Sequence, residues 1–329
     1  MQRVVRLALV VGLGVAIGLA AYVAFLIATN PQPRTAVGWE FLAPLPSARG
    51  ETAAAVADGR LYVIGGMTGL GGEASDEVSV YDPARDTWTE GPSLPAPRHH
   101  AASTSLDGVV YVSGGVAPAD VWEAQTTFWA LDPATQRWHE KAPMPEPRLG
   151  HRMVSVGALL YVVGGIGSTG RVLAYDPATD TWATAAPMPA PRDHLAAVVV
   201  DQEIWAIGGR SGGQNHARVD IYDTAADSWR EGPPLPTPTS GASEAVIDGV
   251  IFISGGEDPG ASNVIDLHWK LDTRSEAGQP WERLSPPPLT VHGAHGAELG
   301  GRFLIVGGAL RPGAYSRFSW TAATQAFQP

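Results

Sequence analysis

Residues 196–209 read AAVVVDQEIWAIGG, and this stretch decides the fold. It consists of two apolar runs, a polar turn between them and a closing pair of glycines. Short β-branched runs on either side of turn residues predict an antiparallel hairpin. Glycine permits positive φ and close backbone approach at the point where a strand ends. The stretch therefore predicts two adjacent strands of an antiparallel sheet.

The same pattern occurs six times along the 329 residues. Its glycine pairs are Gly65-Gly66, Gly114-Gly115, Gly164-Gly165, Gly208-Gly209, Gly255-Gly256 and Gly307-Gly308. Sixteen residues before each pair stand, in order, Arg49, Arg98, Arg148, Arg192, Thr239 and Val291. Successive pairs lie 49, 50, 44, 47 and 52 residues apart. A period near 50 residues indicates a solenoid or a propeller.

Two further markers follow each glycine pair. The first ends a predicted third strand and is Tyr81, Leu131, Tyr175, Tyr222, Leu271 or Trp320. The second opens a predicted fourth strand and is Trp88, Trp138, Trp182, Trp229, Trp281 or Phe327. The two markers are 7 residues apart in every copy except the fifth, where the interval is 10. Because Tyr and Trp bury large areas, we expect them to pack one sheet against the next.

Glycine pair, tyrosine and tryptophan at these spacings resemble the Kelch repeat over residues 39–329. The resemblance is specific because three independent markers keep their register through six copies. It implies an all-β fold, a β-propeller of six four-stranded blades around a central channel. We therefore expect residues 37–329 to form one propeller domain, since propellers grow by repetition within a domain.

The last blade is predicted to be completed by the N-terminal part of the chain. The sixth copy stops at Phe327-Gln328-Pro329, without the rest of its fourth strand. Trp39 stands 10 residues before Arg49, as Trp88 stands 10 residues before Arg98. We therefore expect residues 37–46 to form the closing strand beside the C-terminal strands.

Charge and composition exclude several classes of partner and site. The net charge is −11, whereas nucleic-acid binding requires a basic footprint, so nucleic acid is not an expected partner. The absence of cysteine excludes disulfides, thiolate nucleophiles and Cys-type zinc sites. His99 and His100 are adjacent, and adjacent strand residues point to opposite faces. With no cofactor fingerprint and no metal-ligand spacing, the sequence predicts neither a cofactor nor a metal.

The N-terminal region has the pattern of a membrane anchor. Residues 7–28 are 22 consecutive residues without a charge, long enough for a membrane-spanning helix. Arg3 and Arg6 precede them, so the positive-inside rule makes residues 1–6 a cytoplasmic stub and places the propeller outside the cell membrane. Residues 29–36 form a spacer with two prolines that spans at most about 28 Å. The alternative is a cleaved signal, which would leave the propeller secreted or periplasmic.

Length variation among the repeats falls on one face of the predicted propeller. The interval from the glycine pair to the tyrosine marker varies from 11 to 17 residues. By contrast, the interval from the tryptophan marker to the next arginine position is always 10 residues, and that from the arginine position to the glycine pair is always 16. Variable loops on a constant scaffold usually bind ligands. Seven of the nine histidines map to this face. The predicted ligand-binding residues are Arg49, Arg98, His100, Arg148, His151, Arg152, Arg192, His194, Arg210, His292 and His295.

The arginines of this set allow two interpretations. A ring of guanidinium groups at the channel mouth would bind carboxylate or phosphate groups in a bidentate manner. The alternative is that each arginine hydrogen-bonds neighbouring backbone and only supports its blade. As a set, they favour an anionic ligand, either an acidic carbohydrate or a carboxylate-bearing partner protein.

Glu244 is the one charge at its position of the predicted inner strands, where the other five copies have an uncharged residue. A carboxylate beside a narrow channel is a candidate general base, although such a group also commonly pairs with an arginine. The resemblance to Kelch enzymes adds that bacterial sialic acid mutarotases are exported six-bladed propellers. We therefore expect a membrane-tethered binding module, with a mutarotase-like epimerase as the alternative. The copper chemistry of galactose oxidases is excluded because it needs a cysteine.

Overall fold

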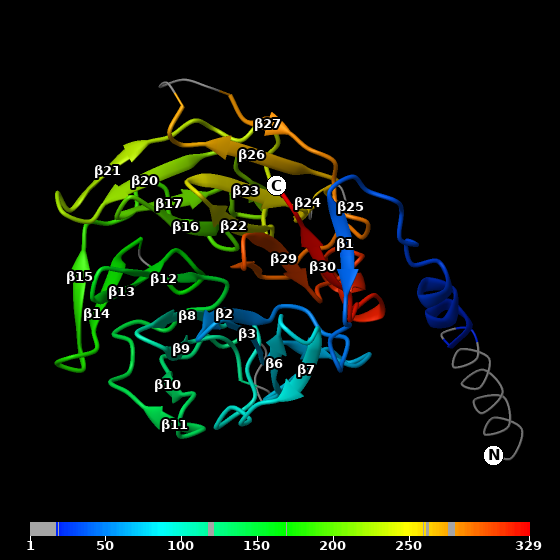
Figure 1. Ribbon diagram of the computed structural model, residues 1–329, viewed down its shortest axis with the longest axis horizontal. Helices are drawn as coiled ribbons and strands as arrows, with labels where there is room; N and C mark the ends of the chain where they lie inside the picture. The colour runs from blue at the N-terminus through cyan, green and yellow to red at the C-terminus, as the bar shows by residue number, and fades with distance from the viewer. Residues whose placement is uncertain are drawn as a thin grey trace, which may run out of the picture.

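The computed structural model describes residues 18, 20–117, 122–168, 170–258, 260, 263–275 and 280–329. They form six four-stranded antiparallel sheets arranged as blades around a common axis (Figure 1). The inner strands of neighbouring blades contact one another around the axis. The expected all-β fold, a six-bladed β-propeller, is therefore confirmed.

The first three blades follow the chain from the inner strand outward. Blade 1 contains β2 (Ala53–Ala57), β3 (Arg60–Ile64), β6 (Val78–Asp82) and β7 (Thr87–Glu90). Blade 2 contains β8 (Ala102–Leu106), β9 (Val109–Ser113), β10 (Phe128–Asp132) and β11 (Arg137–Glu140). Blade 3 contains β12 (Arg152–Val156), β13 (Leu159–Val163), β14 (Val172–Asp176) and β15 (Thr181–Ala185).

The remaining blades repeat this order, with one exchange in the last. Blade 4 contains β16 (Ala196–Val200), β17 (Glu203–Ile207), β20 (Val219–Asp223) and β21 (Ser228–Glu231). Blade 5 contains β22 (Ser243–Ile247), β23 (Val250–Ser254), β26 (His268–Asp272) and β27 (Glu282–Arg283). Blade 6 contains β28 (Gly296–Leu299), β29 (Arg302–Val306), β30 (Thr324–Phe327) and β1 (Trp39–Leu42).

The closing strand of blade 6 is β1, as the sequence predicts. It pairs antiparallel with β30, with Trp39 opposite Phe327 and Leu42 opposite Thr324. Figure 1 shows the blue β1 lying beside the red β30. The strand itself is shorter than the predicted segment 37–46. The two ends of the propeller are therefore held together in one sheet.

The loops that follow the glycine pairs carry additional short elements. Blades 1, 4 and 5 have small hairpins there, which are β4 (Met67–Thr68) with β5 (Glu73–Ala74), β18 (Arg210–Ser211) with β19 (Gln214–Asn215), and β24 (Glu257–Asp258) with β25 (Asn263–Val264). Blade 6 has the 3₁₀ helix η1 (Gly313–Phe318) in the same place. We call this side of the propeller the loop face.

The repeated aromatic residues join neighbouring blades by hydrogen bonds as well as by packing. In blade 4 the Tyr222 hydroxyl donates to Asp227, and the same carboxylate oxygen accepts the Ala186 N–H from the preceding segment. Trp229 donates its indole N–H to the Ala186 carbonyl at 3.0 Å. Blades 1 and 3 repeat the arrangement around Tyr81 and Tyr175. Each of these three blades is therefore fixed to the segment that leads into it.

The N-terminal segment lies against the loop face of blade 6. Residues 20–28 are helical, and the Arg311 guanidinium binds the Leu26 and Thr29 carbonyls at the C-terminal end of this helix. Arg34 of the spacer forms an ion pair with Asp266. No helix within the described part of the chain is long and apolar enough to cross a membrane. The predicted stub 1–6 and most of the predicted anchor 7–28 lie outside the described residues.

Candidate functional site

A turn at the loop-face mouth of the channel precedes the inner strand of each blade. The residues two positions after Arg49, Arg98, Arg148, Arg192, Thr239 and Val291 occupy these turns, and they are Glu51, His100, Gly150, His194, Gly241 and Gly293. Each donates its backbone N–H to the carbonyl of the equivalent residue in the preceding blade, at N···O distances of 2.6 to 3.0 Å. The six hydrogen bonds close a circle, because Glu51 donates to Gly293. We call these six residues the axial ring.

All six residues of the axial ring have left-handed backbone conformations, with φ between 51° and 64°. Glycine adopts this conformation without steric cost, whereas another residue loses roughly 1–2 kcal/mol. Three blades nevertheless have Glu51, His100 and His194 at this position. Backbone strain of this kind is concentrated at functional sites. The glycines also leave room for these side chains, since a Cβ on Gly150 would lie 2.8 Å from the His194 ring.

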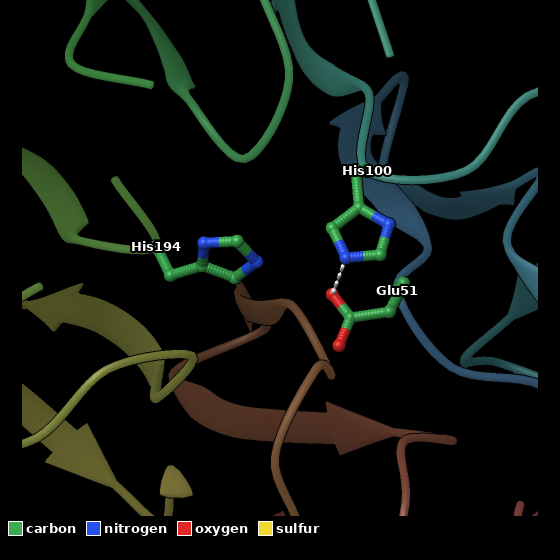
Figure 2. Close-up of side chains that lie close together, drawn as sticks. All are labelled: Glu51, His100 and His194. Atoms are coloured by element: carbon green, nitrogen blue, oxygen red, sulfur yellow. Dashed lines mark ion pairs between the residues drawn. The ribbon is translucent and has the colours of Figure 1, made fainter. Parts of the chain in front are cut away.

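Glu51, His100 and His194 direct their polar atoms toward one another across the axis (Figure 2). His100 Nε2 lies 3.3 Å from the Glu51 carboxylate, and the two imidazole centroids are 5.3 Å apart. One carboxylate oxygen and one nitrogen from each ring all lie within 4.8 Å of one another. The three residues come from blades 1, 2 and 4, so only closure of the propeller brings them together.

The electrostatics make this cluster an anionic carboxylate facing imidazoles. Burial opposes ionisation of Glu51, but the surrounding histidines and Arg210 outweigh it and hold the pKa of Glu51 well below its ordinary value. Burial lowers the pKa of His100 to about 3, although Glu51 opposes this shift. His100 is therefore neutral at neutral pH. A neutral imidazole offers one lone pair to a proton donor or to a metal ion.

His99 orients His100. Their Nδ1 atoms lie 2.6 Å apart, so one ring donates a hydrogen bond to the other. The expectation that these adjacent side chains point to opposite faces is wrong. It assumed extended strand geometry, whereas His100 has a φ of 55° and turns its ring back toward His99. Burial also lowers the pKa of His99.

His194 is oriented by a second set of charged groups. Its Nδ1–H donates to Asp193 at 2.5 Å, which leaves the lone pair on Nε2. That Nε2 lies 3.2 Å from Nη2 of Arg210. Arg210 in turn binds Asp193 and Glu257, at 3.1 and 2.6 Å. Three carboxylates, those of Glu51, Asp193 and Glu257, thus surround the guanidinium of Arg210.

His292 has a polar atom without a partner. Its Nε2–H donates to the Arg311 carbonyl at 2.8 Å. Nδ1 is buried, has no hydrogen-bond partner among the described residues, and lies 3.6 Å from Glu257 and 3.7 Å from Glu51. A buried ring nitrogen facing two carboxylates needs a proton, a water molecule or a cation between them.

A cavity of about 460 Å³ opens on the loop face directly above the axial ring. Its floor contains Glu51, His100, His194 and His292, and Arg210 and Glu257 line its side. Trp122 and Arg317 lie in its wall, and Trp122 is exposed although it contacts the His100 ring at a centroid distance of 5.0 Å. Pockets of roughly 300–1,000 Å³ bind small ligands. We call this space the mouth cavity.

The four repeated arginines lie inside the blades. Arg192 is buried with Asp220 at 2.7 Å and also donates to the Gly208 and Ala206 carbonyls. Arg148 is equally buried and donates to the Gly164 and Arg171 carbonyls. Arg49 pairs with Glu77, and Arg98 stacks on Trp129 at 4.8 Å. As far as the described residues define the mouth cavity, these arginines do not line it.

The remaining predicted site residues lie below the axial ring. His151 and His295 are buried there beside Arg152, and burial holds the pKa of both histidines well below the ordinary value. Arg152 Nε binds Glu244 at 2.7 Å inside a cavity of about 150 Å³. Burial raises the pKa of Glu244, although Arg152 opposes the shift. Glu244 is thus paired with an arginine in a space smaller than common ligand pockets.

Sequence reasoning placed His100, His194, Arg210 and His292 on the loop face, and the structure brings these four together. It did not select Glu51, Asp193, Glu257 or Trp122. A signal for Glu51 was present, because Glu51, His100 and His194 stand at the same position of their repeats while the other copies have glycine there. Glu257 follows its glycine pair directly, as Arg210 does in the preceding repeat.

The blades and their closing strand define the class of this protein as a six-bladed β-propeller with a polar site on its axis. Residues 28–165 and 141–308 match the KLHDC2/KLHL20/DRC7 Kelch-repeats domain. The chain therefore belongs to the Kelch-repeat family.

Curated relatives match short stretches of the chain. The Kelch-like protein terF of Aspergillus terreus is 36% identical over 88 residues, which are 25% of this chain and 19% of that protein. Kelch-like protein 33 of Homo sapiens is 42% identical over 77 residues, or 23% of this chain and 14% of that protein. The F-box/kelch-repeat protein At1g67480 of Arabidopsis thaliana is also 42% identical over 77 residues, covering 23% and 20%. The matched stretches thus span a fifth or less of these relatives.

The fold is also similar to a solved structure, that of YjhT. The two superpose with a TM-score of 0.73 over 87% of this chain and 97% of the other, at 17% sequence identity. At 17% sequence identity, this similarity shows a shared fold and nothing about function.

Proposed function

We propose that this chain is a binding module, tethered to the outer surface of a membrane, that holds an anionic ligand or partner segment in the mouth cavity. Kelch-repeat domains generally bind other proteins. The observation that carries the proposal is the cavity of about 460 Å³ above the axial ring, which is large enough for a sugar or a few peptide residues.

Two side chains of the wall support binding from solvent. Trp122 is exposed beside the cavity, and exposed tryptophans are enriched in binding sites because one face packs while the indole N–H stays available. Arg317 lies at the end of η1 and donates to the Ala314 carbonyl, with its guanidinium at the rim. A carboxylate of the ligand would pair with Arg317 while the ligand body packs on Trp122.

Ligand-observed NMR with the full chain tests this proposal. We expect binding of an acidic probe, N-acetylneuraminate or a Glu-rich peptide, and weaker binding of the neutral sugar N-acetylglucosamine. Trp122→Ala and Arg317→Gln should each lower the affinity for the acidic probe by about tenfold. Arg85→Gln, which changes an exposed arginine of an outer turn, serves as the control. Equal binding of acidic and neutral probes, or no effect of either cavity variant, would contradict the proposal.

The geometry around Glu244 favours binding over mutarotase-like catalysis. A general base must reach its substrate, and Glu244 is bound to Arg152 below the axial ring in a cavity of about 150 Å³. Sialic acid mutarotase activity therefore remains the second candidate. Exchange NMR on N-acetylneuraminate measures it, and a rate equal to the uncatalysed one removes it.

A further inference from the structure

We infer that Glu51, His100 and His194 form a binding site for one divalent transition-metal ion, of the kind represented by Zn²⁺, at the floor of the mouth cavity. One carboxylate oxygen and two imidazole nitrogens are a common ligand set for zinc with an open coordination position. Imidazole ligands favour Zn²⁺, Cu²⁺, Fe²⁺ and Ni²⁺ over Mg²⁺ and Ca²⁺. The three ligand atoms already lie within 4.8 Å of one another.

One of the three ligand–ligand distances already fits a zinc site, and the other two would shorten from at most 4.8 Å. Ligand atoms bound to zinc at about 2.0–2.1 Å in a tetrahedron are about 3.3 Å from each other. The separation of His100 Nε2 from the Glu51 carboxylate is 3.3 Å, as such a site needs. His194 Nε2 would leave its 3.2 Å contact with Arg210, which keeps its bonds to Asp193 and Glu257.

The neighbours of both imidazoles resemble the outer shell of metal sites. Metal-binding histidines usually donate their other ring N–H to a carboxylate or another acceptor, which fixes the tautomer and the direction of the lone pair. His194 does this through Asp193, at 2.5 Å. The Nδ1 of His100 is engaged by His99, at 2.6 Å. Both Nε2 atoms are thereby left for the space between the three residues (Figure 2).

An independent observation points to the same place. His292 is 97% buried, and its Nδ1 has no hydrogen-bond partner among the described residues while it faces Glu51 and Glu257. A cation beside Glu51 would supply a partner for this nitrogen, directly or through a water molecule. Charge also favours a cation, since the three carboxylates of Glu51, Asp193 and Glu257 outnumber the guanidinium groups of Arg210 and Arg317 among the described residues around this cavity.

Backbone strain adds a further argument. Glu51, His100 and His194 keep left-handed φ values of 51°, 55° and 51°, whereas Gly150, Gly241 and Gly293 occupy the equivalent turns. Glycine at these three positions would relieve the strain. Keeping Glu51, His100 and His194 there therefore costs the fold some stability, which indicates a functional role for their side chains. Substitution by glycine is therefore a suitable test, because the axial ring already contains glycine in three blades and the variants should fold.

An open coordination position would face the mouth cavity. If the protein binds an anionic ligand as proposed above, an oxygen of that ligand would complete the coordination of the ion. This step rests on the proposed function, but occupation of the site by the metal does not. Titration with the metal alone therefore separates the two.

The test uses the untagged full chain, freed of metal with EDTA and titrated with ZnCl₂ by calorimetry. We expect one Zn²⁺ per chain with micromolar or tighter affinity, and no comparable heat with MgCl₂. Glu51→Gly and His194→Gly should each weaken Zn²⁺ binding by at least about tenfold, as loss of a supporting or direct ligand does. His139→Ala, which changes an exposed histidine of β11, should leave it unchanged.

Two further measurements keep the test decisive if a variant unfolds. Co²⁺ bound to the wild type should show the visible absorption of tetrahedral coordination. NMR of ¹⁵N-labelled histidines should show shifts at His100 and His194 on Zn²⁺ addition, but none at His139. No binding of Zn²⁺, or binding that persists in both glycine variants and leaves these two imidazoles unshifted, would overturn the inference.

Discussion

Arg192 shows how a repeated residue acquires its role from what surrounds it. The side chains of Arg192 and Asp220 are both fully buried, and the guanidinium also binds the Gly208 and Ala206 carbonyls. The sequence allowed the repeated arginines to be either a ligand ring or internal supports of the blades. The contacts of Arg192 are those of an internal support, because its hydrogen bonds go to blade 4 and to the segment 188–190 that leads into it.

Arg192→Met should therefore destabilise the fold strongly. It leaves Asp220 buried with only the partly exposed Arg218 as a charged partner, and breaking a buried ion pair costs about 3–5 kcal/mol. Denaturation in guanidinium chloride measures the loss. Arg85→Met removes an exposed arginine and should change the unfolding free energy by less than about 0.5 kcal/mol. Equal stability of the two variants would show that Arg192 is not a structural residue.

His268 should make stability depend on pH. It lies in β26 among Trp39, Phe303 and Phe327, and its Nδ1–H donates to the Ser285 carbonyl. Burial lowers its pKa to about 4, below the ordinary value of 6.5. The unfolded chain takes up a proton below pH 6.5 whereas the folded protein resists it down to about pH 4. This contribution to stability is therefore complete above pH 6.5 and is lost as the pH falls toward 4.

The His268→Leu variant isolates this effect, since all other titrating groups are shared. The stability difference between wild type and variant should shrink by up to about 3 kcal/mol between pH 7 and pH 4. Urea denaturation at a series of pH values measures it. Parallel pH profiles for the two proteins would mean that His268 is protonated as easily in the folded state as in the unfolded one.

The short strand β1 is important for closure of the propeller. It contributes only Trp39–Leu42, yet it pairs with β30 and gives blade 6 its fourth strand. Trp39 also packs on His268 of blade 5, and its indole N–H donates to the Ser285 carbonyl. β1 therefore joins two blades in addition to completing one.

Removal of residues 1–46 should destabilise the propeller far more than removal of residues 1–36. The longer truncation exposes the edge of β30 and removes the packing of the half-buried Trp39 against blades 5 and 6. We expect the shorter truncation to unfold cooperatively near the temperature of the full chain. The longer one should aggregate or melt many degrees lower in calorimetry, and matching transitions would refute the closing role of β1.

At the scale of the whole molecule, closure of six blades creates a site that no single blade contains. The axial ring is a circle of six backbone hydrogen bonds, one from each blade, and the mouth cavity lies above it. The N-terminal helix reaches the same face, where Arg311 binds its last carbonyls. A membrane anchor at residues 7–28 would therefore place the loop face close to the bilayer.

Cell fractionation tests the proposed anchor. The full chain should sediment with membranes and resist extraction by high salt and carbonate, because burial of the apolar residues 7–28 does not depend on charge. The propeller 37–329, given a cleavable export signal, should be released. Full chain found in the soluble fraction at a size reduced by about 20–28 residues would instead indicate the cleaved signal.

The sequence by itself determined the number of blades, the hairpins within them and the closing strand, because local periodicity and regular spacing specify those features. It also placed His100, His194, Arg210 and His292 on one face. The tertiary structure decided that the side chains of Glu51, His100 and His194 meet on the axis, and that the repeated arginines lie inside the blades. The physical reason is that a repeat specifies contacts within and between neighbouring blades, whereas partners across the axis depend on how the closed circle orients each turn.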